Sequence, residues 1–311
     1  MTHSVTHSVM FHHFHGKTHL PAQGSLSEND FRDMLIWLKK NYSLIGARNY
    51  AHKFETNTLC DSDICLSFDD GLKCQYDVAV PVLQEFGLDA FFFVYSSAFT
   101  NKPDFLEIYR FFRTSEFDRI DDFYCDFFEI IEQLDKKEYK KQQFLYQKMD
   151  YLSAFPFYSD NDKWFRYLRD QYLDVVKYHE IMNKMILNHG LDVDEVKKNL
   201  WMSEDNLRTI KMKGHTVGLH SYSHPTKISK LSRKEQEIEY LKNYEQLSKV
   251  LDASIKAMSH PCGDYNQDTL DILNSMNIEM GFRSSMSVTE IKSPLEIPRD
   301  DHSNVFKEMH A

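Results

Sequence analysis

Two short segments far apart in the sequence carry side chains that together suit a divalent metal ion. Residues 66–71 read L-S-F-D-D-G and supply two adjacent carboxylates, while residues 218–224 read G-L-H-S-Y-S-H and supply two imidazoles four residues apart. One carboxylate and two imidazoles form a ligand set that zinc and similar ions accept, with positions left for water and substrate. The combination indicates the chemistry of metal-dependent hydrolysis.

The two carboxylates, Asp69 and Asp70, can divide the work of such a reaction. Neighbouring side chains on an extended strand end point to opposite sides, so one can bind metal while the other faces a water molecule. Hydrolysis of a stable amide needs both a polarising ion and a separate base. Taken alone, Asp-Asp-Gly is more often a solvated turn, and single histidines such as His220 or His224 often fill partly buried positions. The motifs become specific in combination.

Both segments follow short apolar runs that predict strands, at residues 63–68 and 215–219. Further strands are predicted at 5–14, 90–95, 255–258 and 279–283, and helices at 27–40, 78–86, 203–213, 232–251 and 269–276. Alternating strands and helices favour a mainly parallel sheet or barrel. The ends of parallel strands are where such folds place their chemistry.

Residues 101–200 interrupt this rhythm. They are polar and aromatic with helical periodicity, and they hold no defensible strand. We find no repeat and no low-complexity linker, so this stretch is predicted to be a helical insertion within a single domain spanning residues 1–311.

Composition excludes several classes of function. The net charge of −10 argues against nucleic acid as a partner. The chain contains no run near the roughly 20 apolar residues of a transmembrane helix, and its start lacks the pattern of a signal peptide. Five cysteines without a C-x-x-C pair favour a reducing compartment. A cytoplasmic location is therefore expected, and the oligomeric state is left open.

The two motifs, in this order, resemble those of the polysaccharide deacetylase family, the NodB-homology enzymes also grouped as carbohydrate esterase family 4. The family's T-F-D-D-G corresponds to S-F-D-D-G at 67–71, and its H-[ST]-x-x-H corresponds to H-S-Y-S-H at 220–224. The resemblance implies that Asp69 is the catalytic base. It also implies that Asp70, His220 and His224 bind the metal.

The family's third motif, R-x-P-[aromatic]-G, is only partly present at residues 259–263. Ser259 stands at the position of the arginine that orients the base, and Cys262 at that of the aromatic residue. A sub-group with Y-P-x-G-x-Y-N and no such arginine agrees better, through Pro261, Tyr265 and Asn266. The resemblance implies that these residues face the substrate and that the Cys262 backbone N–H stabilises the oxyanion. The Cys262 thiol itself is expected to be a small buried apolar group rather than a nucleophile.

Deacetylation also needs an acid that protonates the departing amine, which the family usually supplies as a late L-x-H. That tripeptide is missing near this C-terminus, but the early V-M-F-H-H segment imitates it, and the resembling sub-group carries M-Y-H-H in the same place. His12 is therefore the expected acid, with His13 and then His302 as alternatives. A loose metal-binding tail is the competing interpretation of this histidine cluster.

The segment I-P-R-D-D-H at residues 297–302 resembles the L-P-R-I segment that closes the sub-group's domain. Arg299 is expected to supply the positive charge that is missing at Ser259, and so to keep Asp69 ionised and oriented. Arg283 is the alternative, although an ordinary surface salt bridge explains it better.

The resemblance covers about residues 5–100 and 200–305, and it implies an α/β fold, a distorted (β/α)7 barrel carrying the helical insertion. The implied reaction removes the N-acetyl group from an amino sugar of a saccharide or glycan precursor. It would use one divalent ion, zinc first, with cobalt, nickel or manganese also possible. A superfamily hydrolase of another amide or imide, and a non-catalytic metal-containing carbohydrate-binding protein, are the alternatives.

Overall fold

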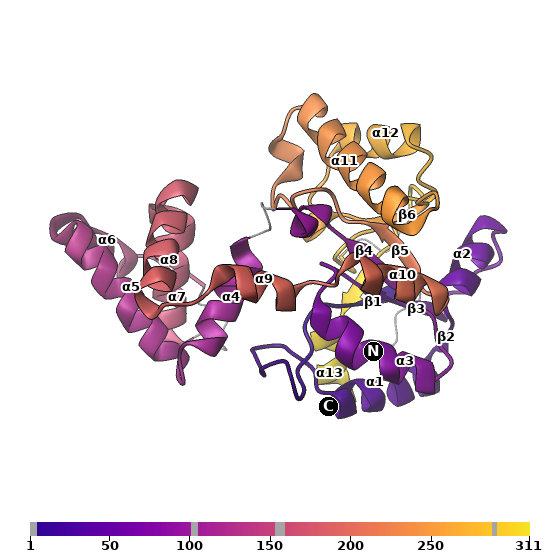
Figure 1. Cartoon of the computed structure of the whole chain (residues 1–311), viewed down its shortest axis with the longest axis horizontal. Coiled ribbons are helices and arrows are strands. Elements are labelled where there is room, and N and C mark those ends of the chain that lie inside the picture. The colour runs from indigo at the N-terminus through magenta and orange to yellow at the C-terminus, as the bar shows by residue number, and fades with distance from the viewer. Residues whose placement is uncertain (1–4, 101–104, 153–158, 288–290) are drawn as a thin grey trace. The chain divides into compact units, whose positions relative to one another are not determined.

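The computed structural model describes residues 5–100, 105–152, 159–287 and 291–311. The chain forms two compact units, one from Met1–Asp104 and Lys197–Ala311 and the other from Phe105–Val196. Figure 1 colours the helices and strands of both units by residue number.

The first unit is built on parallel strands in the order β7-β6-β5-β4-β3-β1-β8, with the short β2 beside β3. A parallel bridge from Phe282 at the end of β7 to Ile297, just before β8, brings the two edges of this sheet together. The result is a nearly closed barrel of seven parallel strands, which confirms the fold predicted from the sequence. The strands are β1 (His7–Phe11), β2 (Ser43–Leu44), β3 (Asp63–Phe68), β4 (Phe91–Val94), β5 (Thr216–Leu219), β6 (Ala257–Ser259), β7 (Met280–Phe282) and β8 (Arg299–Asp301).

Helices of this unit lie outside the strands (Figure 1). Three of them begin at a serine whose side chain closes a capping box, namely Ser27, Ser203 and Ser232, so their starts are encoded locally. The helices are α1 (Glu28–Asn41), α2 (Ala47–Glu55), α3 (Val80–Glu85), α10 (Glu204–Met212), α11 (Arg233–Leu251), α12 (Gln267–Ser275) and α13 (His302–Met309).

Aromatic side chains fill both faces of the strands. Phe68 of β3 stacks on Phe92 of β4 at 4.7 Å between ring centroids, while Phe91 and Phe93 point to the other face and pack on Phe282. Burial on both faces explains why these strands read as continuous apolar runs rather than as alternating patterns. Gly218 in β5 is required for this packing, because a Cβ there would lie 2.6 Å from the Ala257 carbonyl oxygen and from the Phe93 ring.

Several element boundaries differ from the sequence-based expectation. The strand expected at residues 5–14 is confined to His7–Phe11, and the helix expected at 78–86 consists of a π-helical turn, Gln75–Ala79, followed by α3. Helix α2 was not expected at all. None of these differences moves the residues at the carboxyl ends of the strands.

The second unit is entirely helical in its described part. Its elements are α4 (Phe105–Ser115), α5 (Ile120–Leu134), α6 (Lys136–Tyr146), α7 (Asp160–Tyr167), the π-helical turn Leu168–Tyr172, α8 (Val175–His189) and the start of α9 (Val193–Leu200). Its core is aromatic, with Phe165 packed 4.9 Å from Phe127 and 5.4 Å from Phe123 between ring centroids. Residues 101–104 and 153–158 of the expected insertion lie outside the described residues, and its place within a single domain stays a prediction.

Within the described ranges, every helix is too short or too polar to cross a lipid bilayer.

Candidate active site

The two carboxylates diverge because the backbone turns sharply after β3. The Asp69 N–H still donates to the Phe11 carbonyl oxygen at 3.0 Å, in continuation of the β1–β3 pairing. Asp70 then adopts φ +76° and Gly71 φ +62°, so the strand ends within one residue. A left-handed conformation at a non-glycine residue costs on the order of 1–3 kcal/mol and persists only where its surroundings specify it. Gly71 also has little room, since a Cβ there would meet Val94 at 2.9 Å.

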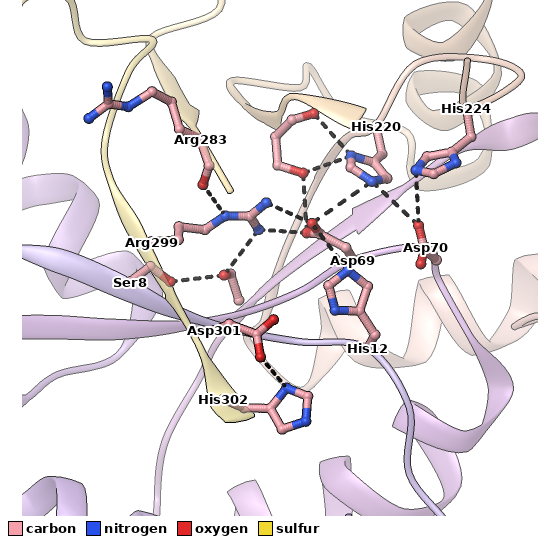
Figure 2. A network of polar contacts seen from close by, with 12 residues as sticks. Ser8, His12, Asp69, Asp70, His220, His224, Arg283, Arg299, Asp301 and His302 are labelled. Carbon is pink, nitrogen blue, oxygen red and sulfur yellow. Dashed lines mark hydrogen bonds and ion pairs between the residues drawn. The ribbon is translucent and has the colours of Figure 1, made fainter. Parts of the chain in front are cut away.

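Asp70 lies beside the two histidines of the second motif (Figure 2). Its Oδ1 is 3.4 Å from His220 Nε2 and 3.5 Å from His224 Nε2. Among the described residues, these three supply ligand atoms that all lie within 4.8 Å of one another. The structure therefore brings the three predicted metal ligands together.

The same atoms pass a further test of whether a cation would fit. Asp70 Oδ1 is buried and has no hydrogen-bond partner among the described residues, and burying such an oxygen unpaired costs free energy. His220 Nδ1 lies 3.0 Å from the Ser259 carbonyl oxygen, which can only accept, so this nitrogen carries the proton. The lone pair of His220 Nε2 therefore faces Asp70, an arrangement that suits a shared divalent ion.

Asp69 is held mainly by a buried arginine from outside the third motif. Arg299 is 0 % exposed and donates from Nη1 to Oδ1 and from Nη2 to Oδ2, both at 2.7 Å. Arg283, the alternative considered above, contributes its carbonyl oxygen, which accepts from Arg299 Nε at 2.6 Å. Figure 2 shows this chain of contacts. Two parallel charge-assisted bonds fix the Asp69 carboxylate in its plane.

Electrostatics keep Asp69 ionised. Burial alone would raise the pKa of its carboxyl group, but the charge of Arg299, with those of His220 and His12 and the Arg299 hydrogen bonds, lowers the pKa to about 2. Its Oδ2 lies 3.9 Å from His220 Nε2, so an ionised carboxylate stands directly beside the three convergent ligands.

His12 reaches the same carboxylate from the neighbouring strand. Phe11 and Phe68 are register partners in the parallel pair β1 and β3. The next residues, His12 and Asp69, therefore lie side by side at the carboxyl ends of these strands. His12 Nε2 is 3.9 Å from Asp69 Oδ2, and its side chain is 30 % exposed. Burial lowers the pKa of His12, against the charges of Asp70 and Asp69, which raise it.

The two alternative acids are placed differently. His302 is buried, donates from Nε2 to the Gly24 carbonyl oxygen at 3.0 Å, and stacks on Phe11. The ring of His13 lies 6.2 Å from that of His12. Only His12 of these three has a described contact with Asp69.

The third-motif segment divides between exposed and structural positions. Cys262 is exposed with φ +53°, which corrects the expectation of a buried thiol, because the left-handed backbone turns this residue outward. Tyr265 donates to Glu296 at 2.7 Å and stacks on His260, while Pro261 is buried. Asn266 caps α12 by accepting from Thr269 N–H at 3.1 Å. The structure thus gives the Asn266 side chain a cap rather than a place beside Asp69.

Two residues that sequence reasoning left without a role also hold this site. Ser259, at the missing arginine, donates to Asp69 Oδ1 at 3.1 Å and lies 2.7 Å from His220 Nδ1. Gln75 donates to the carbonyl oxygens of His12 at 2.9 Å and Asp69 at 2.5 Å, and so ties the ends of β1 and β3. Neither lies in a periodic pattern that could have marked it, although the place of Ser259 in the third motif was a usable signal.

Comparisons with known proteins agree with this geometry. A family model described as polysaccharide deacetylase matches residues 160–281, a range that includes both histidines of the second motif but not Asp69 or Asp70. A search of curated protein sequences finds no match.

Solved structures share the fold at low sequence identity. The deacetylase PplD of Streptococcus pyogenes, solved with acetate, has a TM-score of 0.56 at 15% identity, covering 96% of this chain and 93% of its own. IcaB of Ammonifex degensii gives 0.56 at 12%, covering 95% and 91%, and a de-N-acetylase of Aggregatibacter actinomycetemcomitans gives 0.55 at 12%, covering 94% and 93%. The family match over residues 160–281 and the shared barrel agree with the resemblance read from the sequence, which is to the polysaccharide deacetylase family.

Proposed function

We propose that the chain is a metal-dependent deacetylase that removes the N-acetyl group from an amino sugar of a saccharide or glycan precursor, releasing acetate and a free amine. One observation carries the proposal. An ionised carboxylate, Asp69, lies beside two imidazoles and one carboxylate whose ligand atoms converge, with Asp70 and His220 buried and His224 partly buried. The family match and the de-N-acetylase fold support the choice of substrate.

Asp70, His220 and His224 would hold the metal, zinc being the first choice for this ligand set and cobalt, nickel or manganese also suiting it. When bound, a divalent ion polarises the amide carbonyl and makes water more acidic. The backbone N–H of Cys262, the exposed residue of the turn Pro261–Gly263, would donate to the oxygen that becomes negative.

The chain's own residues then move the protons. Asp69, held in place by Arg299 and Ser259, accepts a proton from the attacking water while the new carbon–oxygen bond forms. His12 Nε2, 3.9 Å from Asp69 Oδ2, protonates the sugar nitrogen as the carbon–nitrogen bond breaks. A proton transferred from Asp69 to His12 restores both groups, and the products are acetate and the free amine.

Substitution Asp69→Asn tests the assignment of the base. It keeps the size of the side chain and removes its ability to accept a proton, so we expect acetate release to fall by about 10²–10⁴-fold. Metal content should stay at the wild-type level, because Asp70 and both histidines are untouched. Enzymatic detection of acetate from a panel of N-acetylated saccharides, with elemental analysis of the protein, measures both quantities.

Asp61→Asn is the matched control, because Asp61 is exposed in the turn before β3, at the end of the strand opposite to Asp69. Near wild-type turnover in Asp69→Asn would contradict the mechanism. A wild-type protein that cleaved cyclic imides but none of the saccharides would instead contradict the proposed substrate.

A further inference from the structure

The buried face of α11 carries polar side chains where a barrel helix normally packs apolar ones. This helix contacts β5 and the turn Ser96–Phe99, and it buries Gln236 and Asn243 completely alongside Tyr240 and Leu247. A buried amide without partners costs free energy, so such residues are kept where their hydrogen bonds do something. The partners of Gln236 are Thr269 and the Leu231 carbonyl oxygen, away from the metal ligands.

Asn243 is bonded to the first histidine ligand. Its Oδ1 accepts from the backbone N–H of His220 at 3.0 Å. Its Nδ2 donates to the Val94 carbonyl oxygen at 3.0 Å and to Ser96 Oγ at 2.9 Å. The Asn243 amide therefore links His220, which follows β5, to Val94 at the end of the adjacent strand β4.

Glu239 lies one helical turn earlier on the same face and holds the middle of the turn. Its Oε2 accepts from the backbone N–H groups of Tyr222 at 3.1 Å and Ser223 at 2.8 Å. Its Oε1 accepts from the Ser223 hydroxyl at 2.8 Å. All three bonds fall between the two histidine ligands, in the turn that separates them.

That turn has a backbone that does not form by preference. Ser221 has φ +60° and His224 has φ +55°, both in the left-handed region. Within the turn, Ser221 Oγ accepts from the His224 N–H at 3.1 Å. From outside it, the Ser97 N–H donates to the Tyr222 carbonyl oxygen at 2.8 Å. A strained backbone of this kind persists when its neighbours over-determine it, and α11 supplies four of those bonds.

We infer that Glu239 and Asn243 are positioning residues, which hold the backbone of residues 220–224 so that His220 and His224 converge on Asp70. The inference rests on the proposed metal-dependent function. It deepens that function by assigning the geometry of the metal site to a helix that supplies none of the ligands. Groups that orient metal ligands typically change metal affinity or activity by about 10–100-fold when they are removed.

Glu239→Ala and Glu239→Gln form the central pair of variants. Alanine removes all three acceptor contacts, whereas glutamine keeps one carbonyl oxygen that can accept from both backbone N–H groups. We expect Glu239→Ala to weaken Co²⁺ binding by about 10–100-fold and Glu239→Gln to stay within about threefold of wild type. Titration of the metal-free protein with Co²⁺, followed by visible absorption, reports both the affinity and the symmetry of the ligand field.

Asn243→Asp is the second test. It keeps an acceptor for the His220 N–H but places an oxygen against the Val94 carbonyl, so it should alter the cobalt spectrum and lower the unfolding temperature together. Glu245→Ala is the control, because Glu245 is an exposed residue of the same helix. It should leave affinity, spectrum and unfolding temperature unchanged.

Two results would overturn the inference: an unchanged Co²⁺ affinity and spectrum in Glu239→Ala, or an equal loss in Glu239→Gln. A lower unfolding temperature in Glu239→Ala with an unchanged spectrum would also overturn it, because the residue would then be structural only. The titration needs no saccharide. Failure of wild-type protein to release acetate would therefore contradict the proposed substrate and leave this comparison standing.

Discussion

At the scale of single residues, the site replaces one missing arginine by two contributions from different strands. Ser259, where the resemblance places an arginine, gives Asp69 a single neutral hydrogen bond. Arg299 of β8 supplies the charge and both parallel bonds. Position in the motif is therefore not what matters to Asp69. What matters is a guanidinium whose fork matches the carboxylate.

Arg299→Met should be strongly destabilising, because it leaves the Asp69 carboxylate buried without its counter-charge. We expect a loss of about 3–5 kcal/mol in the free energy of unfolding, together with loss of acetate release. Arg299→Lys should recover only part of both, since an ammonium group cannot make two parallel bonds. Chemical denaturation of the metal-free proteins measures the difference.

Arg233→Met is the matched control for this experiment. Arg233 also pairs with an aspartate, Asp268, but its side chain is 52% exposed, and exposed pairs contribute about 0–1 kcal/mol. Equal losses in Arg299→Met and Arg233→Met would show that the buried pair has no special part in the fold.

Most residues of the candidate site could be predicted from the sequence. The others could not, for a physical reason. Asp69, Asp70 and the two histidines stand in short motifs whose side-chain types match one chemistry, and Arg299 was expected as their counter-charge. Glu239 and Asn243 could not be found this way, because both act on backbone groups of a turn that they reach only once α11 packs on β5. Helical periodicity describes which face is buried and says nothing of such bonds.

At the scale of helices and strands, the elements whose ends are marked in the local sequence were the ones predicted. Strand β3 was predicted with its observed bounds, since its apolar run ends at two aspartates, and the serine caps marked the starts of α1, α10 and α11. Helix α2 was missed because its N-cap, Gly46, makes no side-chain cap bond. Strands β2 and β8 were also missed, because β2 has only two residues and the three residues of β8, Arg-Asp-Asp, include none that is apolar.

His215, at the entry to β5, predicts an acid-sensitive step in the stability of the barrel. Its Nδ1 accepts from the Ala90 N–H at 3.1 Å, and this hydrogen bond forms only while the His215 ring is neutral. Burial lowers the pKa of His215 to about 4, from an ordinary value of 6.5. The folded state then binds fewer protons than the unfolded chain, so stability is lost as the pH falls from about 6.5 towards 4.

His215→Gln should flatten this part of the profile, because the unfolded chain then gains no proton at residue 215. The measurement is the free energy of unfolding by urea at a series of pH values, with metal removed. His52→Gln, at an exposed position of α2, is the control and should keep the wild-type slope. A profile for His215→Gln that parallels wild type between pH 4 and 6.5 would contradict this role.

At the scale of the whole barrel, closure brings the two ends of the chain to the same carboxylate. Strand β1 lies between β3 and β8, so His12 near the N-terminus and Arg299 near the C-terminus both reach Asp69. The proposed metal ligands follow the ends of β3 and β5, with β4 between these strands. The candidate site is therefore complete only when strands from both ends of the sequence have paired.

Because a metal would link Asp70 to His220 and His224 across the barrel, it should stabilise the folded chain and not the unfolded one. At a free Zn²⁺ concentration about 100 times the dissociation constant, we expect a gain of about 2.7 kcal/mol, seen as an unfolding temperature higher by several degrees and reversed by a chelator. Asp70→Asn should lose most of this gain, since the neutral amide is a far weaker ligand, whereas Asp61→Asn, in the exposed turn before β3, should keep it. Thermal unfolding with and without Zn²⁺ decides the matter: an equal rise in wild type and Asp70→Asn would place the metal elsewhere on the chain.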